Sequence, residues 1–572
     1  MRSRYALIFG RGAARHRMRE IADAKGLVIA ADSSSFLLVT EPEAPFLIGA
    51  RTALLGRVWT SDLQQLEQID DKFENIAAAD DLRRLPTGYN GQFALFTMDD
   101  QARPRAYRDP SGAIGVFHLP LEGQDLFFSD AEFACALGFL STAVIDVRFA
   151  IHWLQFPFLK TKRAGLKGLT EVLPGTWHIG TERGWATEPG WDPWSHCQPA
   201  RSMIDRSQAV LALRQTALGI IPRQTATESP WLQLSGGLDS SIIGACLHQV
   251  GRSFDAIHVA TSSPDGDERR FADDAALAYR IRVKTIFEEE LRPALEMPAE
   301  RSVLPGANPV LAPIERAIVH HVIENGADLL IDGGGGDNLF CYLATAAPVL
   351  DAFRYGPRGA TRRSISALAE VTRSTWWEVL RAAWRLQYHR LVGRRRWRQD
   401  RSYIDRQLWL RDPEPHPWLS GCAGAPPGKR EHVETILQIQ HFFDRRVDWS
   451  VPVVHPLMAQ PLLELCLRIP SWMWIEGGQD RSVAREAFKD LVPQSILSRR
   501  MKGSLQGFIR RSFQRLRPAL RELLLEGELR RTGILDLRAT EAVFTQGWDA
   551  DSAQLRLSEM ASLELWMRSW RS

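Results

Sequence analysis

Short hydrophobic runs that alternate with polar residues fill the first 200 residues of the chain. Turn-forming pairs such as Asp109-Pro110 and Glu122-Gly123 separate these runs. Alternation with a period of two, interrupted by Gly, Pro and Asp, is typical of strands joined by tight turns. The clearest runs are Ala6–Phe9, Phe36–Val39, Gln92–Thr97 and Asp125–Ser129. The pattern predicts an antiparallel, β-rich (α+β) domain over residues 1–200, with Pro189–Ala200 as its connector to the rest of the chain.

From about residue 203 the pattern changes, because longer helical stretches alternate with short apolar strands. The expected helices are Ser207–Ile221, Ser240–Gln249 and Asp267–Ile281, and the expected strands are Trp231–Leu234, Asp255–Thr261, Val283–Phe287 and Ala327–Ile331. This alternation predicts βαβ units and a parallel sheet, whose carboxyl edge is the usual place for a ligand. We therefore expect an α/β domain over residues 201–572, with a helical, Arg-rich region at about 355–430.

Composition narrows the possible protein classes. The 572 residues are 45% hydrophobic and 24% charged, with a net charge of +3, which is typical of a globular protein and argues against nucleic-acid binding by bulk electrostatics. No run approaches the ~18 apolar residues of a membrane span, and the N-terminal apolar run is too short for a signal peptide. The six cysteines form no CxxC pair. We expect a cytoplasmic protein with reduced thiols.

The first candidate site is the segment Gln233-Leu234-Ser235-Gly236-Gly237-Leu238-Asp239-Ser240-Ser241, between an expected strand and an expected helix. Its glycines allow close approach of an anion, and the free N–H groups of the new helix point at it. A carboxylate inside an anion-binding loop requires a cation between Asp239 and the phosphates. A plain Gly-Gly turn with a serine helix cap is the simpler alternative, but it does not account for the whole segment.

The second candidate site is Asp332-Gly333-Gly334-Gly335-Gly336-Asp337, which follows the strand that ends at Ile331. Four glycines in a row are entropically costly, so close approach to a ligand explains them better than a flexible turn. In a parallel sheet this loop can reach the same edge as the first. Asp239 and Asp337 are therefore the expected Mg²⁺ ligands.

Ser235-Gly236-Gly237-Leu238-Asp239-Ser240 resembles the SGGxDS loop of the ATP pyrophosphatases, and nearly the whole chain resembles the asparagine synthetase family. Tyr89–Ala94, Arg108–Gly112 and Leu173–Thr176 resemble parts of its glutaminase-type domain, and Asp267-Glu268 lies where the family has a DE pair. The resemblance implies an adenine nucleotide alpha hydrolase-like C-terminal domain and an Ntn-like N-terminal domain. It also implies ATP and Mg²⁺ as cofactors and adenylation of a carboxylate before an amine attacks.

The resemblance also assigns site residues. Arg500-Met501-Lys502-Gly503 is similar to the RxKxG segment that supplies a catalytic lysine in β-lactam synthetases, which makes Lys502 the expected catalytic cation and Arg500 its assistant. Lysine is rare here, with nine residues against 62 arginines. The expected ATP-binding residues are Leu234, Ser235, Gly236, Gly237, Asp239, Ser240, Val259, Ala260, Gly333 and Gly334. The base that deprotonates the amine stays open among Glu268, Asp267 and Tyr342.

Two departures from the family refine the expected reaction. Residue 2 is Arg rather than the nucleophilic Cys of the glutamine-hydrolysing members, so we expect a degenerate glutaminase-type domain. Asparagine synthetases carry Glu and β-lactam synthetases Tyr where this chain has Gly334. The loop up to Tyr342 and the segment His416–Leu419 resemble the lasso peptide cyclases.

The lasso cyclase resemblance implies an ATP-dependent macrolactam synthetase that joins a precursor peptide's N-terminal amine to an Asp or Glu side chain. It also implies a leader-peptide protease and a leader-recognition protein as candidate partners. The alternative is an asparagine synthetase or β-lactam synthetase-like amide ligase without glutaminase activity.

Overall fold

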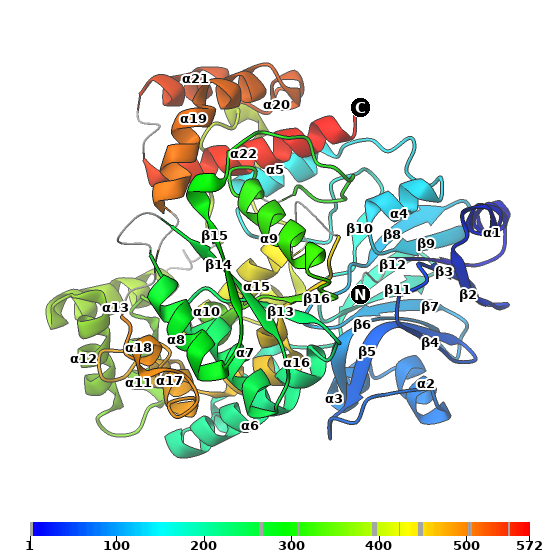
Figure 1. Cartoon of the computed structure of the whole chain (residues 1–572). Coiled ribbons are helices and arrows are strands. Elements are labelled where there is room, and N and C mark those ends of the chain that lie inside the picture. The colour runs from blue at the N-terminus through cyan, green and yellow to red at the C-terminus, as the bar shows by residue number, and fades with distance from the viewer. Residues whose placement is uncertain are drawn as a thin grey trace.

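The computed structural model describes residues 4–261, 267–306, 308–391, 397–422, 424–443, 445, 450–500, 503, 506–546 and 550–571. Two antiparallel six-stranded sheets occupy the N-terminal part of the chain, and a parallel five-stranded sheet lies in the C-terminal part (Figure 1). The observed sheets lie within residues 5–189 and 230–454. The domain boundary near residue 200 stays a prediction.

The two N-terminal sheets pack face to face. In order across each sheet, the first contains β10 (Thr170–Glu171), β8 (Phe117–Leu121), β9 (Gln124–Phe128), β1 (Tyr5–Phe9), β3 (Phe36–Thr40) and β2 (Val28–Asp32), and the second contains β12 (Gly184–Pro189), β11 (Thr176–Thr181), β7 (Pro104–Arg108), β6 (Tyr89–Met98), β5 (Thr52–Thr60) and β4 (Phe46–Ile48). Alternate residues explain the layers: Leu7 faces the other sheet, whereas Ile8 faces a helix. The antiparallel strands predicted from the alternating runs are confirmed.

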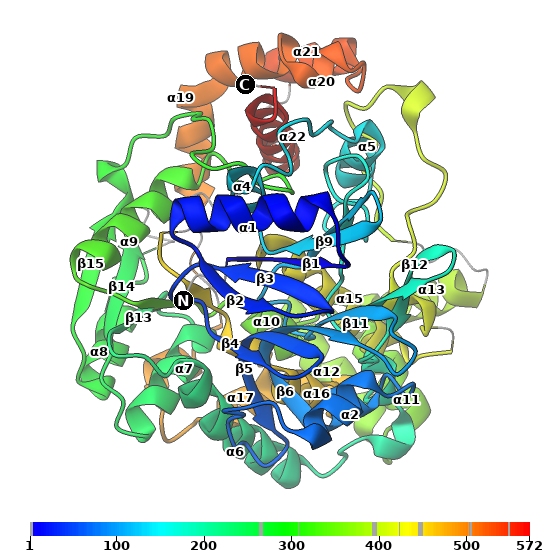
Figure 2. The same cartoon turned by 90° about the vertical axis from the view of Figure 1, so that its right-hand side faces the viewer.

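Helices cover both outer faces of this pair of sheets. On the first sheet lie α1 (Ala13–Lys25), α4 (Ala131–Ala136) and α5 (Val147–Gln155), and on the second lie α2 (Asp71–Ala78) and α3 (Arg84–Gly88). Figure 2 shows α1 running across the strands of the first sheet. The N-terminal part is thus four layers, helix, sheet, sheet and helix.

The C-terminal sheet is parallel throughout. Its strands are, in spatial order, β15 (Val283–Phe287), β14 (Asp255–Ala260), β13 (Pro230–Gln233), β16 (Leu329–Ile331) and β17 (Val453–Val454). The first four confirm the predicted strands. The fifth was missed, because two residues are too few to show a periodicity.

Helices cover both faces of the parallel sheet. Leu232 on β13 packs with α6 (Arg206–Gln224), α7 (Leu238–Gln249) and α8 (Arg269–Tyr279), whereas its neighbour Trp231 packs with α9 (Ala312–Glu324). A parallel sheet covered on both faces is the usual arrangement for such strands. Together with the N-terminal sheets, this confirms a two-domain α/β architecture in its coarse form.

The remaining helices are α10 (Gly336–Leu339), α11 (Ala347–Tyr355), α12 (Ala360–Thr372), α13 (Trp376–Leu391), α14 (Pro417–Ser420), α15 (Pro427–Phe443), α16 (Gln460–Arg468), α17 (Ser482–Ala487), α18 (Gln494–Leu497), α19 (Gln506–Leu525), α20 (Glu528–Arg531), α21 (Leu537–Thr545) and α22 (Asp551–Ser569). Of these helices, α19 to α22 pack with α5 of the N-terminal part. The region at 355–430 is helical only in part, since residues 397–416 are largely irregular. Prolines at 413, 415 and 417 restrict the backbone there.

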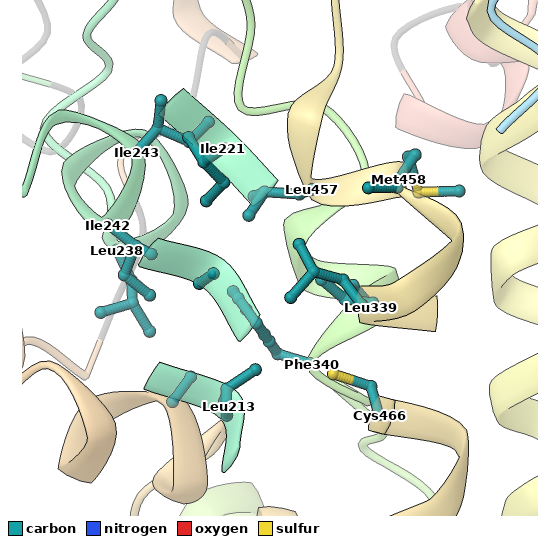
Figure 3. Packing of buried hydrophobic residues seen from close by; sticks show 14 of the residues in the cluster. Leu213, Ile221, Leu238, Ile242, Ile243, Leu339, Phe340, Leu457, Met458 and Cys466 are labelled. Carbon is teal, nitrogen blue, oxygen red and sulfur yellow. The ribbon is translucent and has the colours of Figure 1, made fainter. Parts of the chain in front are cut away.

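A dense apolar core lies beneath the carboxyl edge of β13 and β16. Figure 3 shows Leu213 and Ile221 of α6, Ile242 and Ile243 of α7, and Leu339 after the tetraglycine loop converging on one another. Each such buried side chain contributes about 1.5–3 kcal/mol. This packing holds the helices that follow the two glycine-containing loops in a fixed relation to the sheet.

Two other expectations concern the whole chain. In the part of the chain that the structure describes, no helix is both long and apolar enough to cross a membrane. All six cysteines are free thiols, and four of them are buried. Burial raises the pKa of the Cys197 thiol to about 12, which makes it a poor nucleophile.

Candidate active site

The loop between β13 and α7 has the backbone that an anion site needs. Gly236 has a φ of +75°, and a Cβ there would lie 3.0 Å from the carbonyl oxygen of Glu268. Only glycine fits both requirements. Gly237 precedes α7 and supplies no side-chain cap, so the first N–H groups of the helix are left for a ligand.

Serine hydroxyls order this loop. The hydroxyls of Ser235 and Ser240 lie 3.1 Å apart, and Ser240 Oγ accepts a hydrogen bond from the Ser235 N–H at 3.2 Å. Ser241 Oγ donates to the carbonyl of Gly237 at 2.7 Å. Ser241 therefore has a structural contact, whereas Ser235 and Ser240 present two hydroxyls beside the helix N-terminus.

The tetraglycine loop after β16 lies directly against the first loop. A Cβ on Gly333 would lie 3.1 Å from the amide nitrogen of Ser240, and one on Gly336 would lie 2.5 Å from Cβ of Asp239. Contacts this short explain why glycine is needed at both positions. The two glycine-lined turns predicted from sequence do meet at one edge of the sheet.

The carboxylates of Asp239 and Asp337 converge on one cation, the guanidinium of Arg481. Its Nη1 pairs with Asp337 Oδ1 and lies 3.5 Å from Asp239 Oδ1. Burial alone would lower the pKa of Arg481, but three neighbouring carboxylates raise it above its ordinary value. The donor set therefore suits a positive ion between the two loops, and a Mg²⁺ bound through two carboxylates and substrate phosphates fits this chemistry.

Arg481 was not predicted. It precedes α17 with a φ of 50°, a left-handed conformation that is uncommon for a residue with a side chain. In the sequence it is one of 62 arginines, so nothing local marks it. Its guanidinium also lies 5.3 Å from the ring centre of Tyr342, which places that candidate base beside the carboxylate pair.

Glu268 joins the first loop to the RxKxG segment. Its Oε1 accepts a hydrogen bond from the Gly503 N–H at 2.6 Å and pairs with Arg499 Nη2. Arg499 Nη1 in turn donates to the carbonyl of Gly236 at 3.2 Å. These contacts assign Glu268 a positioning role rather than that of a free base.

Four other predicted site residues, Leu234, Val259, Ala260 and Asp267, lie in different surroundings. Leu234, Val259 and Ala260 lie at the carboxyl ends of β13 and β14, and the Leu234 carbonyl accepts a hydrogen bond from His258 Nδ1 at 2.8 Å. Asp267 pairs with Arg269 instead of facing the loops. Their roles stay predictions.

Of the two predicted catalytic cations, Arg500 and Lys502, the structure describes only Arg500. Within the described residues, Arg500 has an exposed side chain that forms no hydrogen bond or ion pair with either loop. Lys502 lies outside the residues that the structure describes. Both catalytic assignments therefore stay predictions.

Gly334 faces away from the first loop. A Cβ there would lie 3.0 Å from His455 Nδ1 and 3.1 Å from Asp332 Oδ2. His455 follows β17, the strand that the sequence pattern missed. Among the described residues no group of three or more His, Cys, Asp or Glu is placed to hold a metal ion.

The family match lies in the C-terminal part of the chain. The asparagine synthase family matches residues 224–568, more than half of the chain. The carboxyethyl-arginine β-lactam-synthase of Streptomyces clavuligerus is 28% identical over 188 residues, which is 32% of this chain and 36% of that protein. The chain thus matches only about a third of this curated relative's length.

Similar solved structures include a glutamine phosphoribosylpyrophosphate amidotransferase from B. subtilis complexed with ADP and GMP, with 11% identity, a TM-score of 0.20, and coverage of 58% of this chain and 81% of that one. A U34-tRNA thiolase from Methanococcus maripaludis has 14% identity, a TM-score of 0.19, and coverage of 40% and 78%. These TM-scores are too low to demonstrate a shared fold. The family match, by contrast, is decisive: the chain belongs to the asparagine synthase family.

Proposed function

We propose that this member of the asparagine synthase family is an ATP-dependent carbon–nitrogen ligase. It adenylates a carboxylate, releases pyrophosphate, and transfers the acyl group to an amine with release of AMP. The contact of Gly333 with Ser240 and of Gly336 with Asp239 carries this proposal. It supports a single site at which the N–H groups at the start of α7 lie beside two carboxylates.

In the first step a negatively charged carboxylate attacks the negatively charged α-phosphate of ATP. The step therefore depends on neutralising the phosphate charge and on aligning the two reacting groups. The N-terminus of α7, with the hydroxyls of Ser235 and Ser240, binds the pyrophosphate portion of ATP. Asp239 and Asp337 would hold Mg²⁺, which would neutralise the phosphates. Without the ion, Arg481 compensates the two carboxylates. Leu234, Val259, Ala260 and Gly334 border the nucleotide.

The second step creates a tetrahedral oxyanion and a departing AMP. Lys502, with Arg500, stabilises this charge. The network of Glu268, Arg499 and Gly503 supports the assignment, because it fixes the residue next to Lys502 in sequence against the pyrophosphate loop. Removing a comparable donor costs about 10²–10³-fold in rate.

We propose a peptide as the substrate: the N-terminal amine of a precursor peptide attacks an Asp or Glu side chain of the same peptide, which closes the macrolactam of a lasso peptide, a class of antibiotics. Gly334 supports this choice, since it removes the side chain that asparagine and β-lactam synthetases carry there. A leader-peptide protease and a leader-recognition protein are the proposed partners. The match to a β-lactam-synthase favours a second candidate, an amide ligase acting on a small amino acid.

The N-terminal part is proposed to be a degenerate, Ntn-like glutaminase domain, and the parallel sheet an adenine nucleotide alpha hydrolase-like domain. The four-layer arrangement of the N-terminal sheets supports the first assignment. Arg2 lies outside the described residues. Added glutamine is therefore expected to release no glutamate, and glutamate release would contradict the assignment.

The test of the reaction is ATP–pyrophosphate exchange with a panel of carboxylates: precursor peptides encoded next to the gene, aspartate and N²-carboxyethyl-arginine. A peptide that drives exchange and then loses one water by mass spectrometry supports the peptide ligase. Exchange with a free amino acid alone supports the second candidate. Asp239→Asn is expected to abolish exchange, whereas undiminished exchange would refute the metal-binding role of Asp239.

A further inference from the structure

The tetraglycine loop has a second face, which borders a different set of side chains. Gly333 and Gly336 touch the nucleotide loop, but a Cβ on Gly334 would lie 3.0 Å from His455 Nδ1 and one on Gly335 would lie 2.5 Å from Met458 Sδ. The same loop therefore borders both the two carboxylates and His455. It places an imidazole next to the loop at which the acyl adenylate is proposed to form.

His455 is held in one orientation. Its ring stacks on Phe443, with ring centres 4.0 Å apart and planes 19° apart. The buried Nδ1 faces Asp332 Oδ2 at 3.4 Å, and the other oxygen of Asp332 accepts the Gly334 N–H at 3.1 Å. The contact between Nδ1 and Asp332 does not count as a hydrogen bond, and it becomes an ion pair when the ring carries a proton.

His455 also lines a cavity of about 240 Å³ between the two domains. The walls contributed by residues 329–458 are Leu329, Phe443, Val451, Pro452, Val453, Val454, His455 and Met458. The rest of the lining comes mainly from the N-terminal part and from residues 300–304, and it includes the charged side chains of Arg4, Arg57, Asp130, Glu300 and Arg301. A cavity of this size admits a small part of a substrate beside the imidazole, whose side chain is 19% exposed.

We infer that His455 is the base that accepts the proton of the attacking amine, and that Asp332 is its positioning residue. The inference rests on the proposed ligase function and identifies the base that sequence reasoning left open. The amine nitrogen forms a bond to the acyl carbon, and its proton passes to His455 Nε2. The bond from the acyl carbon to the AMP oxygen then breaks, and AMP leaves with the electron pair.

The charges around His455 suit this role. Asp332, on the loop after β16, is the carboxylate that faces the ring. Phe443 on α15, Met458 and Gly334 provide uncharged contacts. The neighbouring carboxylate stabilises the imidazolium that forms when the proton is accepted.

The experiment separates the two half-reactions in His455→Gln. With the carboxylate identified by the exchange panel, the variant is expected to keep wild-type ATP–pyrophosphate exchange. It is expected to lose about 10²–10⁴-fold in amide formation, the usual contribution of a general base. Asp332→Asn is expected to lose part of this rate with exchange unchanged. His320→Gln, at an exposed histidine on α9, is the matched control and is expected to change neither rate.

Hydroxylamine supplies a readout that a structural role would not affect. It is largely unprotonated at neutral pH, so it needs no base to attack an acyl adenylate. His455→Gln is therefore expected to form the hydroxamate at the wild-type rate while amide formation fails. If hydroxamate and amide formation fall together, or amide formation persists, the inference is overturned. If the wild-type protein shows no exchange with any carboxylate, the proposed function fails first.

Discussion

Replacing Arg481 with Met tests whether the two glycine-lined loops form a cation site. Methionine keeps much of the side-chain volume but removes the charge that Asp239 and Asp337 share. The variant is expected to be less stable in metal-free buffer, because the two carboxylates then lie close together with less compensation. Mg²⁺ is expected to restore part of the loss by taking the place of the guanidinium.

The magnitude follows from the distances and the exposure. A charge pair at ~4 Å is worth about 4 kcal/mol at an effective dielectric constant of about 20, offset by the cost of desolvating the arginine. Removing one partner of a buried pair costs about 3–5 kcal/mol. The Asp239 side chain is 11% exposed, but that of Asp337 is 34% exposed, so solvent screens its share. We expect a loss of about 3 kcal/mol.

Urea unfolding in EDTA and in millimolar Mg²⁺ measures both effects. Arg214→Met is the matched control, since it breaks an ion pair with Asp490 that is exposed on both sides and is expected to cost less than about 1 kcal/mol. A loss at Arg481 no larger than at Arg214 would contradict the buried-pair reasoning. If Mg²⁺ does not stabilise the Arg481 variant, the two carboxylates do not form a cation site.

Three further variants test other parts of the structure. Gly336→Ala places a methyl group 2.5 Å from Cβ of Asp239. It is expected to lower the free energy of unfolding by about 1–3 kcal/mol and the rate of pyrophosphate release by about 10²-fold. Gly88→Ala, with open space around it, is the control in the unfolding and pyrophosphate assays. Glu268→Gln removes the charge that holds Arg499 and the Gly503 N–H, so kcat for amide formation is expected to fall about 10–100-fold. Asp490→Asn, which breaks the ion pair with Arg214, is expected to leave kcat unchanged, and an equal fall in both variants would refute the positioning role. Burial lowers the pKa of His152 to about 4, below its unfolded value, so protonation favours unfolding and stability is lost as the pH falls from about 6.5 to 4. His152→Gln is expected to flatten that slope in urea unfolding at pH 7.5 and 5.5, and an unchanged slope would show that other groups cause it.

The sequence by itself determined the local parts of this protein. The Ser-Gly-Gly-rich turn before α7 and the four glycines after Ile331 were recognisable, because glycine and serine have local conformational and hydrogen-bonding consequences. The apolar strands before each turn were equally visible, since a strand buried on both faces is a continuous apolar run. Because the strands are parallel, both turns follow carboxyl ends at the same edge of the sheet.

Tertiary structure alone decided which side chains complete the site. Arg481 reaches Asp239 from 242 positions along the chain, and His455 reaches Asp332 only because a two-residue strand adds itself to the sheet. Neither contact is visible as a pattern in the local sequence, because hydrogen bonds and ion pairs depend on distance in space. The number of residues between two positions does not tell whether they are close in space when a long folded segment lies between them.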